Sequence, residues 1–129
     1  MPAYTDRRVS NTGTFNIEIV KGTDFLLIGR VQEKNEAFGS GGYIPVDVTS
    51  WTWTSKIKSA DLGTELATFV VSIADQNVDP GVFYLALDDS ITETLPTSSG
   101  VYDVIAFANN VKRQVLRGTV KIVDSVSAY

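Results

Sequence analysis

Hydrophobic residues alternate with polar residues along most of this chain, and a period of two is the pattern of β-strands with one buried face. Residues 15–19 and 82–87 are two such rows, and Gly, Asp, Asn and Ser stand between the rows as turn residues. The pattern predicts about seven or eight short strands. It indicates an all-β fold, an antiparallel β-sandwich of the immunoglobulin-like kind.

One short segment has a helical signature instead. Residues 89–95 read DSITETL, in which Ser90 followed by Glu93 matches a capping box and Pro96 ends the helix. Residues 32–42 are polar and rich in glycine, which is typical of a loop. The sandwich is therefore expected to contain one short helical turn and one long polar connection.

The chain has 129 residues, which fits a single domain. We expect a flexible N-terminal arm at residues 1–12, one β-sandwich domain at 13–124 and a C-terminal tail at 125–129. The arm has no pattern of core residues, so Arg7 and Arg8 are predicted to contact a partner on which the arm becomes ordered. Nothing in this stretch has the apolar segment of a signal peptide.

Composition excludes several classes of function. The chain contains neither His nor Cys, which excludes zinc sites of the Cys/His type, thiol nucleophiles and Ser-His-Asp triads. The net charge of −4 provides no broad positive field for nucleic acid, and no apolar run is long enough to cross a membrane. We therefore expect a protein that is not an enzyme, needs no cofactor and binds neither nucleic acid nor membrane.

Three weaker functional signals have simpler explanations. The glycine-rich residues 39–42 lack the Lys and the helix start of a phosphate loop. A pair of carboxylates can hydrolyse a glycosidic bond, but with 15 acidic residues some pair always has a suitable separation. Four aspartates could supply oxygen ligands to a hard cation, although their spacing fits no known loop motif: Asp75, Asp79, Asp88 and Asp89.

Two tryptophans raise a sharper alternative. Trp51 and Trp53 share one face of a predicted strand with Ser55 and Ile57. If they are exposed beside Tyr43, their rings can stack on sugars in a host glycan. Because Ile57 lies on the same face, we interpret both rings as anchors of the core.

The last part of the chain reads as two strands joined by a turn at Asn109 and Asn110, residues that tolerate positive φ. Asp103 is the one charged residue on an otherwise apolar face of the first strand, and a buried charge needs a partner. Arg113 or Arg117 is the expected partner, together with Tyr102 as a structural neighbour. Asp103→Ala is then expected to cost on the order of 2–4 kcal/mol, and Gly118 is expected to allow a bulge in the closing strand.

The order and spacing of short motifs resemble a family of small β-sandwich domains in tailed bacteriophages. The family pattern has a Pro-x-Asp-(Leu or Val)-Thr-(Gly or Ser)-(Trp or Tyr) segment, a Thr in a short helical turn, Gly-x-Tyr-Asp, and a closing strand with Arg, Leu, Gly and Val. The corresponding residues here are Pro45, Asp47, Thr49, Trp51, Thr92, Gly100, Tyr102, Asp103, Arg113, Leu116, Gly118 and Val120.

Proteins of this family are virion components of baseplates, tails or fibre-attachment domains. The resemblance implies a virion structural protein, assembled in the host cytoplasm, that acts as a tail, baseplate or neck adaptor or as a fibre-attachment subunit. Its partners would be other virion proteins and copies of itself. The alternatives are a capsid decoration protein and a carbohydrate-binding module for host recognition.

Overall fold

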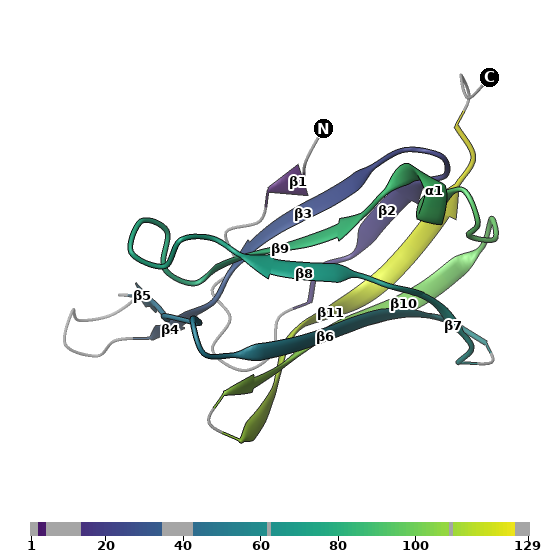
Figure 1. The fold of residues 1–129 in the computed structure, drawn as a ribbon. Coiled ribbons are helices and arrows are strands. Elements are labelled where there is room, and N and C mark those ends of the chain that lie inside the picture. The colour runs from purple at the N-terminus through teal and green to yellow at the C-terminus, as the bar shows by residue number, and fades with distance from the viewer. Residues whose placement is uncertain (1–2, 5–13, 35–42, 62, 109, 126–129) are drawn as a thin grey trace.

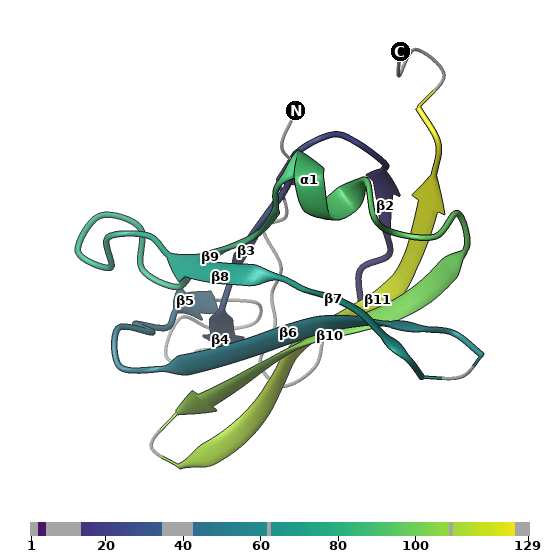
Figure 2. The ribbon, with the colours of Figure 1, turned by 45° about the vertical axis from the view of Figure 1, so that its right-hand side comes forward.

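A computed structural model describes residues 3–4, 14–34, 43–61, 63–108 and 110–125 of the chain. These residues form two β-sheets that pack face to face, with one short helix at one end of the sandwich (Figures 1 and 2). The predicted all-β sandwich is confirmed. Arg7 and Arg8 lie outside the described residues.

The four-stranded sheet has the order β1-β3-β9-β8 and the five-stranded sheet the order β2-β11-β10-β6-β7. Neighbouring strands are antiparallel except in the parallel pairs β1·β3 and β2·β11. The first sheet comprises β1 (Ala3–Tyr4), β3 (Phe25–Arg30), β9 (Val82–Leu87) and β8 (Val70–Ile73). The second comprises β2 (Ile17–Val20), β11 (Val111–Val123), β10 (Ser99–Ala108), β6 (Thr52–Ser59) and β7 (Glu65–Thr68).

More strands are present than the sequence pattern predicts, for three reasons. Residues 65–73 read as one strand, but the chain passes from the five-stranded sheet to the four-stranded sheet at Phe69, whose side chain is buried between them. In addition, β4 (Gln32–Lys34) pairs with β5 (Tyr43–Pro45) as a small separate sheet, where a loop was expected to begin. Part of the expected N-terminal arm is also a strand, because β1 pairs with β3.

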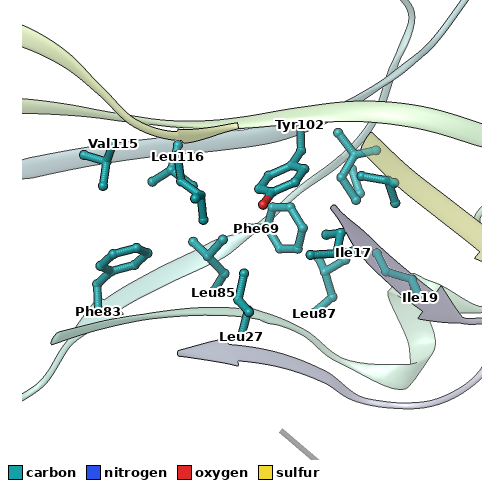
Figure 3. Packing of buried hydrophobic residues seen from close by; sticks show 14 of the residues in the cluster. Ile17, Ile19, Leu27, Phe69, Phe83, Leu85, Leu87, Tyr102, Val115 and Leu116 are labelled. Atoms are coloured by element: carbon teal, nitrogen blue, oxygen red, sulfur yellow. The ribbon is translucent and has the colours of Figure 1, made fainter. Parts of the chain in front are cut away.

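The core lies between the facing sides of the two sheets (Figure 3). The rows predicted from alternation point inward: Ile17 and Ile19 from β2 and Leu85 and Leu87 from β9 are all buried in the core. Alternation works here because each strand buries one face and exposes the other.

A β-bulge interrupts the ladder between β10 and β11. Val104 pairs with Leu116 and Ile105 pairs with Gln114, so Val115 is the extra residue of β11. Val115 and Leu116 are consecutive and both buried, and Figure 3 shows both side chains pointing into the core. As a result, the odd-numbered residues of β11 face inward up to Val115, and the even-numbered residues face inward from Leu116 onward.

The helix α1 (Asp89–Thr92) connects β9 to β10. Its N-cap is Asp88, whose carboxylate accepts a hydrogen bond of 3.1 Å from the backbone N–H of Ile91. The prediction of Ser90 as N-cap is therefore wrong by two residues, because Ser90 is already helical and its hydroxyl donates to Asp88. Thr92 is buried and donates its hydroxyl to the carbonyl of Thr23, which attaches the helix to the turn between β2 and β3.

Candidate functional site

Tyr102 and Gly118 lie opposite each other on the inner side of β10 and β11. The Tyr102 hydroxyl donates a hydrogen bond of 2.5 Å to the carbonyl of Phe15, and its ring lies against Phe69. A side chain at position 118 would overlap the same Phe15 carbonyl. The two residues thus hold the backbone that leads into β2 close to β11, which is a structural role.

The bulge predicted at Gly118 lies instead at Val115. Gly118 is required by the close approach of the Phe15 backbone rather than by a change in strand direction. That approach is supported by a hydrogen bond of 2.8 Å from the Phe15 N–H to the Arg117 carbonyl, and by one of 3.0 Å from the Thr119 N–H to the Asn16 side chain.

Asp103 is half-buried on the outer face of the five-stranded sheet, so the expectation of a buried charge is wrong. It lies between Lys56 on β6 and Arg117 on β11, with which it is in register. Gln114 donates a hydrogen bond of 3.4 Å to its carboxylate. The aspartate therefore balances cationic neighbours across three strands at a surface.

Arg113, the other expected partner of Asp103, faces the opposite side of the sheet. The bulge at Val115 causes this, because without the extra residue Arg113 would share a face with Arg117. Its guanidinium carbon lies 5.5 Å from the ring centroid of Trp51, a cation–π distance. Arg113 therefore covers an aromatic ring at the rim of the core.

Trp51 and Trp53 are half-buried and pack against the core. Their ring centroids are 5.8 Å apart, and Trp53 also stacks on Phe83 at 5.2 Å. With one ring stacked on a core phenylalanine and the other covered by Arg113, the pair does not present the open platform that sugar stacking requires. The side chain of Tyr43 lies outside the described residues.

The outer face of the five-stranded sheet carries a depression lined by polar and apolar side chains. We define the outer face by the residues of β6, β10 and β11 that point away from the core. These are Thr52, Thr54, Lys56, Lys58, Ser99, Val101, Asp103, Ile105, Phe107, Lys112, Gln114, Arg117, Thr119 and Lys121. The depression has a volume of about 590 Å³ and reaches from β6 across β10 to β11 and to Thr14 and Asn16.

The middle row of this outer face is more apolar than a water-facing row normally is. Val101 is 44% exposed and Phe107 is 43% exposed, and Asp103 and Ile105 lie between them in the row. Threonine, lysine, glutamine and arginine flank this row on both neighbouring strands. The face thus combines an apolar strip with a polar rim, the arrangement of protein interfaces.

Most charges of the outer face are positive. Lys56, Lys58 and Arg117 line the depression together with the single carboxylate of Asp103. Lys56 also forms an ion pair of 3.0 Å with Glu65 on β7. The hydrogen bond that Lys56 donates to Glu65 and the positive charge of Lys56 lower the pKa of Glu65. The Glu65 carboxylate therefore stays ionised into mildly acidic solution.

The outer face offers ammonium and guanidinium groups, hydroxyls, amides and the carboxylate of Asp103. Among the residues that the structure describes, no group of carboxylates is arranged to hold a metal ion. No helix in the described ranges is long and apolar enough to cross a membrane.

The sequence pattern identified only part of this surface. Alternation places Thr52, Thr54, Lys56 and Lys58 on one side of β6, but it does not reveal their neighbours on β10 and β11. The signal that was available is the consecutive apolar pair Val115 and Leu116, which marks the bulge and so assigns Gln114 to the outer face.

Comparisons with known proteins find similarity in fold but not in sequence. No protein-family description matches the chain, and no curated protein matches its sequence. The fold is similar to a solved structure described as the N-terminal domain of phage TP901-1 ORF48, with a TM-score of 0.48. The alignment covers 96% of this chain and 98% of that chain at 9% sequence identity, values that assign no function.

Proposed function

We propose that this protein is a structural subunit of a tailed-bacteriophage virion. In this proposal it serves as a small tail, baseplate or neck adaptor, or as a fibre-attachment subunit. Two observations support it: the ordered motifs that resemble the phage sandwich family, including Gly100, Tyr102 and Asp103, and a β-sandwich with a surface suited to binding a protein.

The observation that carries the proposal is the outer face of the five-stranded sheet. An antiparallel sheet that faces only water has polar residues on that side, whereas three of the five outward residues of β10 are apolar. Large apolar side chains grouped on an exposed surface are typical of interaction sites. Flanking Lys, Arg and Thr supply the polar rim that gives such a contact its orientation.

A binding role also agrees with the residues that the outer face lacks. With no His or Cys in the chain, general base and nucleophile would have to be Lys, Asp or Thr. Asp103 accepts a hydrogen bond from Gln114 and lies in register with Lys56 and Arg117, contacts that suit a structural role. We therefore propose that the protein binds and does not catalyse.

The test is to locate the protein in particles of the phage whose genome encodes it. Gradient-purified particles are analysed by quantitative mass spectrometry against the major capsid protein, and a labelled antibody locates the station by electron microscopy. We expect a fixed copy number per particle and label on the tail, baseplate or neck. Label on the capsid surface would support a decoration protein instead. Absence of the protein from purified particles would overturn the virion proposal.

A further inference from the structure

The end of the sandwich that carries α1 is strongly acidic. Asp88 caps α1, and Asp24 accepts a hydrogen bond of 2.8 Å from the backbone N–H of Asp89. Glu93 follows the helix, and Asp124 lies near Lys21 at 3.8 Å. Ile91 is 42% exposed among these carboxylates. We define the α1 end as Asp24, Asp88, Asp89, Ile91, Glu93 and Asp124.

The described positive charges are concentrated elsewhere. Eight Lys and Arg side chains are described, and five of them lie on the outer face of the five-stranded sheet. These five are Lys56, Lys58, Lys112, Arg117 and Lys121. Three carboxylates lie beside them, so the outer face keeps a positive balance in a chain whose net charge is −4: Glu18, Glu65 and Asp103.

These two surfaces cannot meet within one molecule. The α1 end lies where β9 leads into β10, whereas the outer face points away from the four-stranded sheet (Figures 1 and 2). A contact between them joins different copies, and it joins different patches on the two copies. Such a contact is heterologous, and it builds rings or open filaments according to its rotation angle.

We propose that the outer face of one copy binds the α1 end of a second copy, head to tail. The carboxylates of Asp89 and Glu93 face Lys58 and Arg117, and Ile91 meets the apolar strip of Val101, Ile105 and Phe107. Opposite charges steer the two surfaces together, and the apolar contact stabilises the encounter. In the virion, this contact would join neighbouring copies of the subunit, so its biological role rests on the proposed function.

The experiment uses charge reversal on each surface separately. One variant carries Lys58→Glu and Arg117→Glu on the outer face, and the other carries Asp89→Lys and Glu93→Lys at the α1 end. A matched control carries Asp75→Lys and Asp79→Lys, which reverse two exposed acidic residues in the connection between β8 and β9. Circular dichroism and melting curves identify the variants that fold.

Association is measured by sedimentation velocity at low and high salt over a concentration series. We expect the wild-type chain to associate at low salt and to dissociate at high salt, because screening weakens charge contacts. Each reversal should weaken association at least tenfold, and the control should not. Mixing the two reversed variants should restore association, since each then supplies the charge that the other has lost.

A wild-type chain that stays monomeric at low salt and high concentration would overturn the head-to-tail contact. Association that ignores both reversals, or that mixing does not restore, would do the same. If one charge-reversal variant fails to fold, the other variant still tests the contact. Ile91→Ser then provides a further test from the α1 end. If the protein is a monomer in solution but is present in particles at a fixed copy number, the head-to-tail contact is refuted and the proposed virion function stands. If the protein associates in solution but is absent from particles, the contact stands and the proposed virion function is refuted.

Discussion

Val104 and Val101 lie three residues apart on β10 but on opposite faces of the five-stranded sheet. Val104 is fully buried against the other sheet, whereas Val101 is 44% exposed beside a basic depression. The inner face is held by packing and by the Tyr102 contact with Phe15. The outer side of β10 also carries apolar side chains, those of Val101, Ile105 and Phe107, but no layer covers them among the described residues. Under the proposed function, the outer apolar residues serve an intermolecular contact rather than the stability of the isolated fold.

Gly118→Val should have the largest effect on stability. It tests whether the inner side of β11 has room for a side chain at position 118. The new side chain would overlap the backbone carbonyl of Phe15, which cannot move without pulling β2 off β11. We expect a loss of about 3 kcal/mol in the free energy of unfolding by urea. Thr119→Val, at the next and exposed position, should change stability by less than about 0.5 kcal/mol. Equal unfolding midpoints for the two variants would refute this view of Gly118.

A matched pair of Val→Ala substitutions compares the two faces directly. Val104→Ala should destabilise the protein by about 2 kcal/mol, because two buried methyl groups are lost and a cavity remains. Val101→Ala should leave stability within about 0.5 kcal/mol. Thermal unfolding of both variants measures the contrast. A comparable cost at position 101 would mean that the outer face also supports the fold.

Asp103→Ala should have a modest effect on stability. A half-buried carboxylate between Lys56 and Arg117 contributes at the level of an exposed cross-strand pair, about 0.2–1 kcal/mol. Asp103→Asn keeps the acceptor for Gln114 and should recover part of that loss. A cost of several kcal/mol in urea unfolding would restore the hypothesis of a buried ion pair.

Acidification should produce the smallest effect and act at the α1 end. Hydrogen bonds from Ser90 and Ile91 lower the pKa of Asp88, so its contribution to stability is present above about pH 4 and is lost as the pH falls through its folded pKa. Asp88→Asn keeps a capping oxygen that does not titrate. Melting temperatures between pH 5 and pH 2.5 should therefore fall less steeply for Asp88→Asn than for the wild type. Parallel curves would contradict the capping role.

The sequence predicts the fold well because the evidence for a strand is local. Alternation in residues 15–19, 51–57 and 82–87 correctly assigns inward faces and a sandwich. It does not show that a single apolar run changes sheets at Phe69, since both halves bury the same kind of side chain.

The residues of the candidate site are harder to predict from the sequence. The side of the sheet on which a side chain lies depends on how neighbouring strands are paired. Both faces of β10 are largely apolar, so alternation alone does not decide which side Asp103 occupies. One extra residue at Val115 then moves Arg113 away from Asp103 and replaces it with Gln114. The basic depression is formed by three strands that are distant in sequence, and no local motif encodes it.

Hydroxyl-radical footprinting of the free protein and of the protein in purified particles tests the central claim most directly. Phe107 is exposed on the outer face, whereas Tyr102 on the same strand is buried. We predict that Phe107 reacts readily in the free protein and is strongly protected in particles, while Tyr102 is protected in both. A Phe107 that reacts equally in both states would show that the outer face of the five-stranded sheet is not the docking surface.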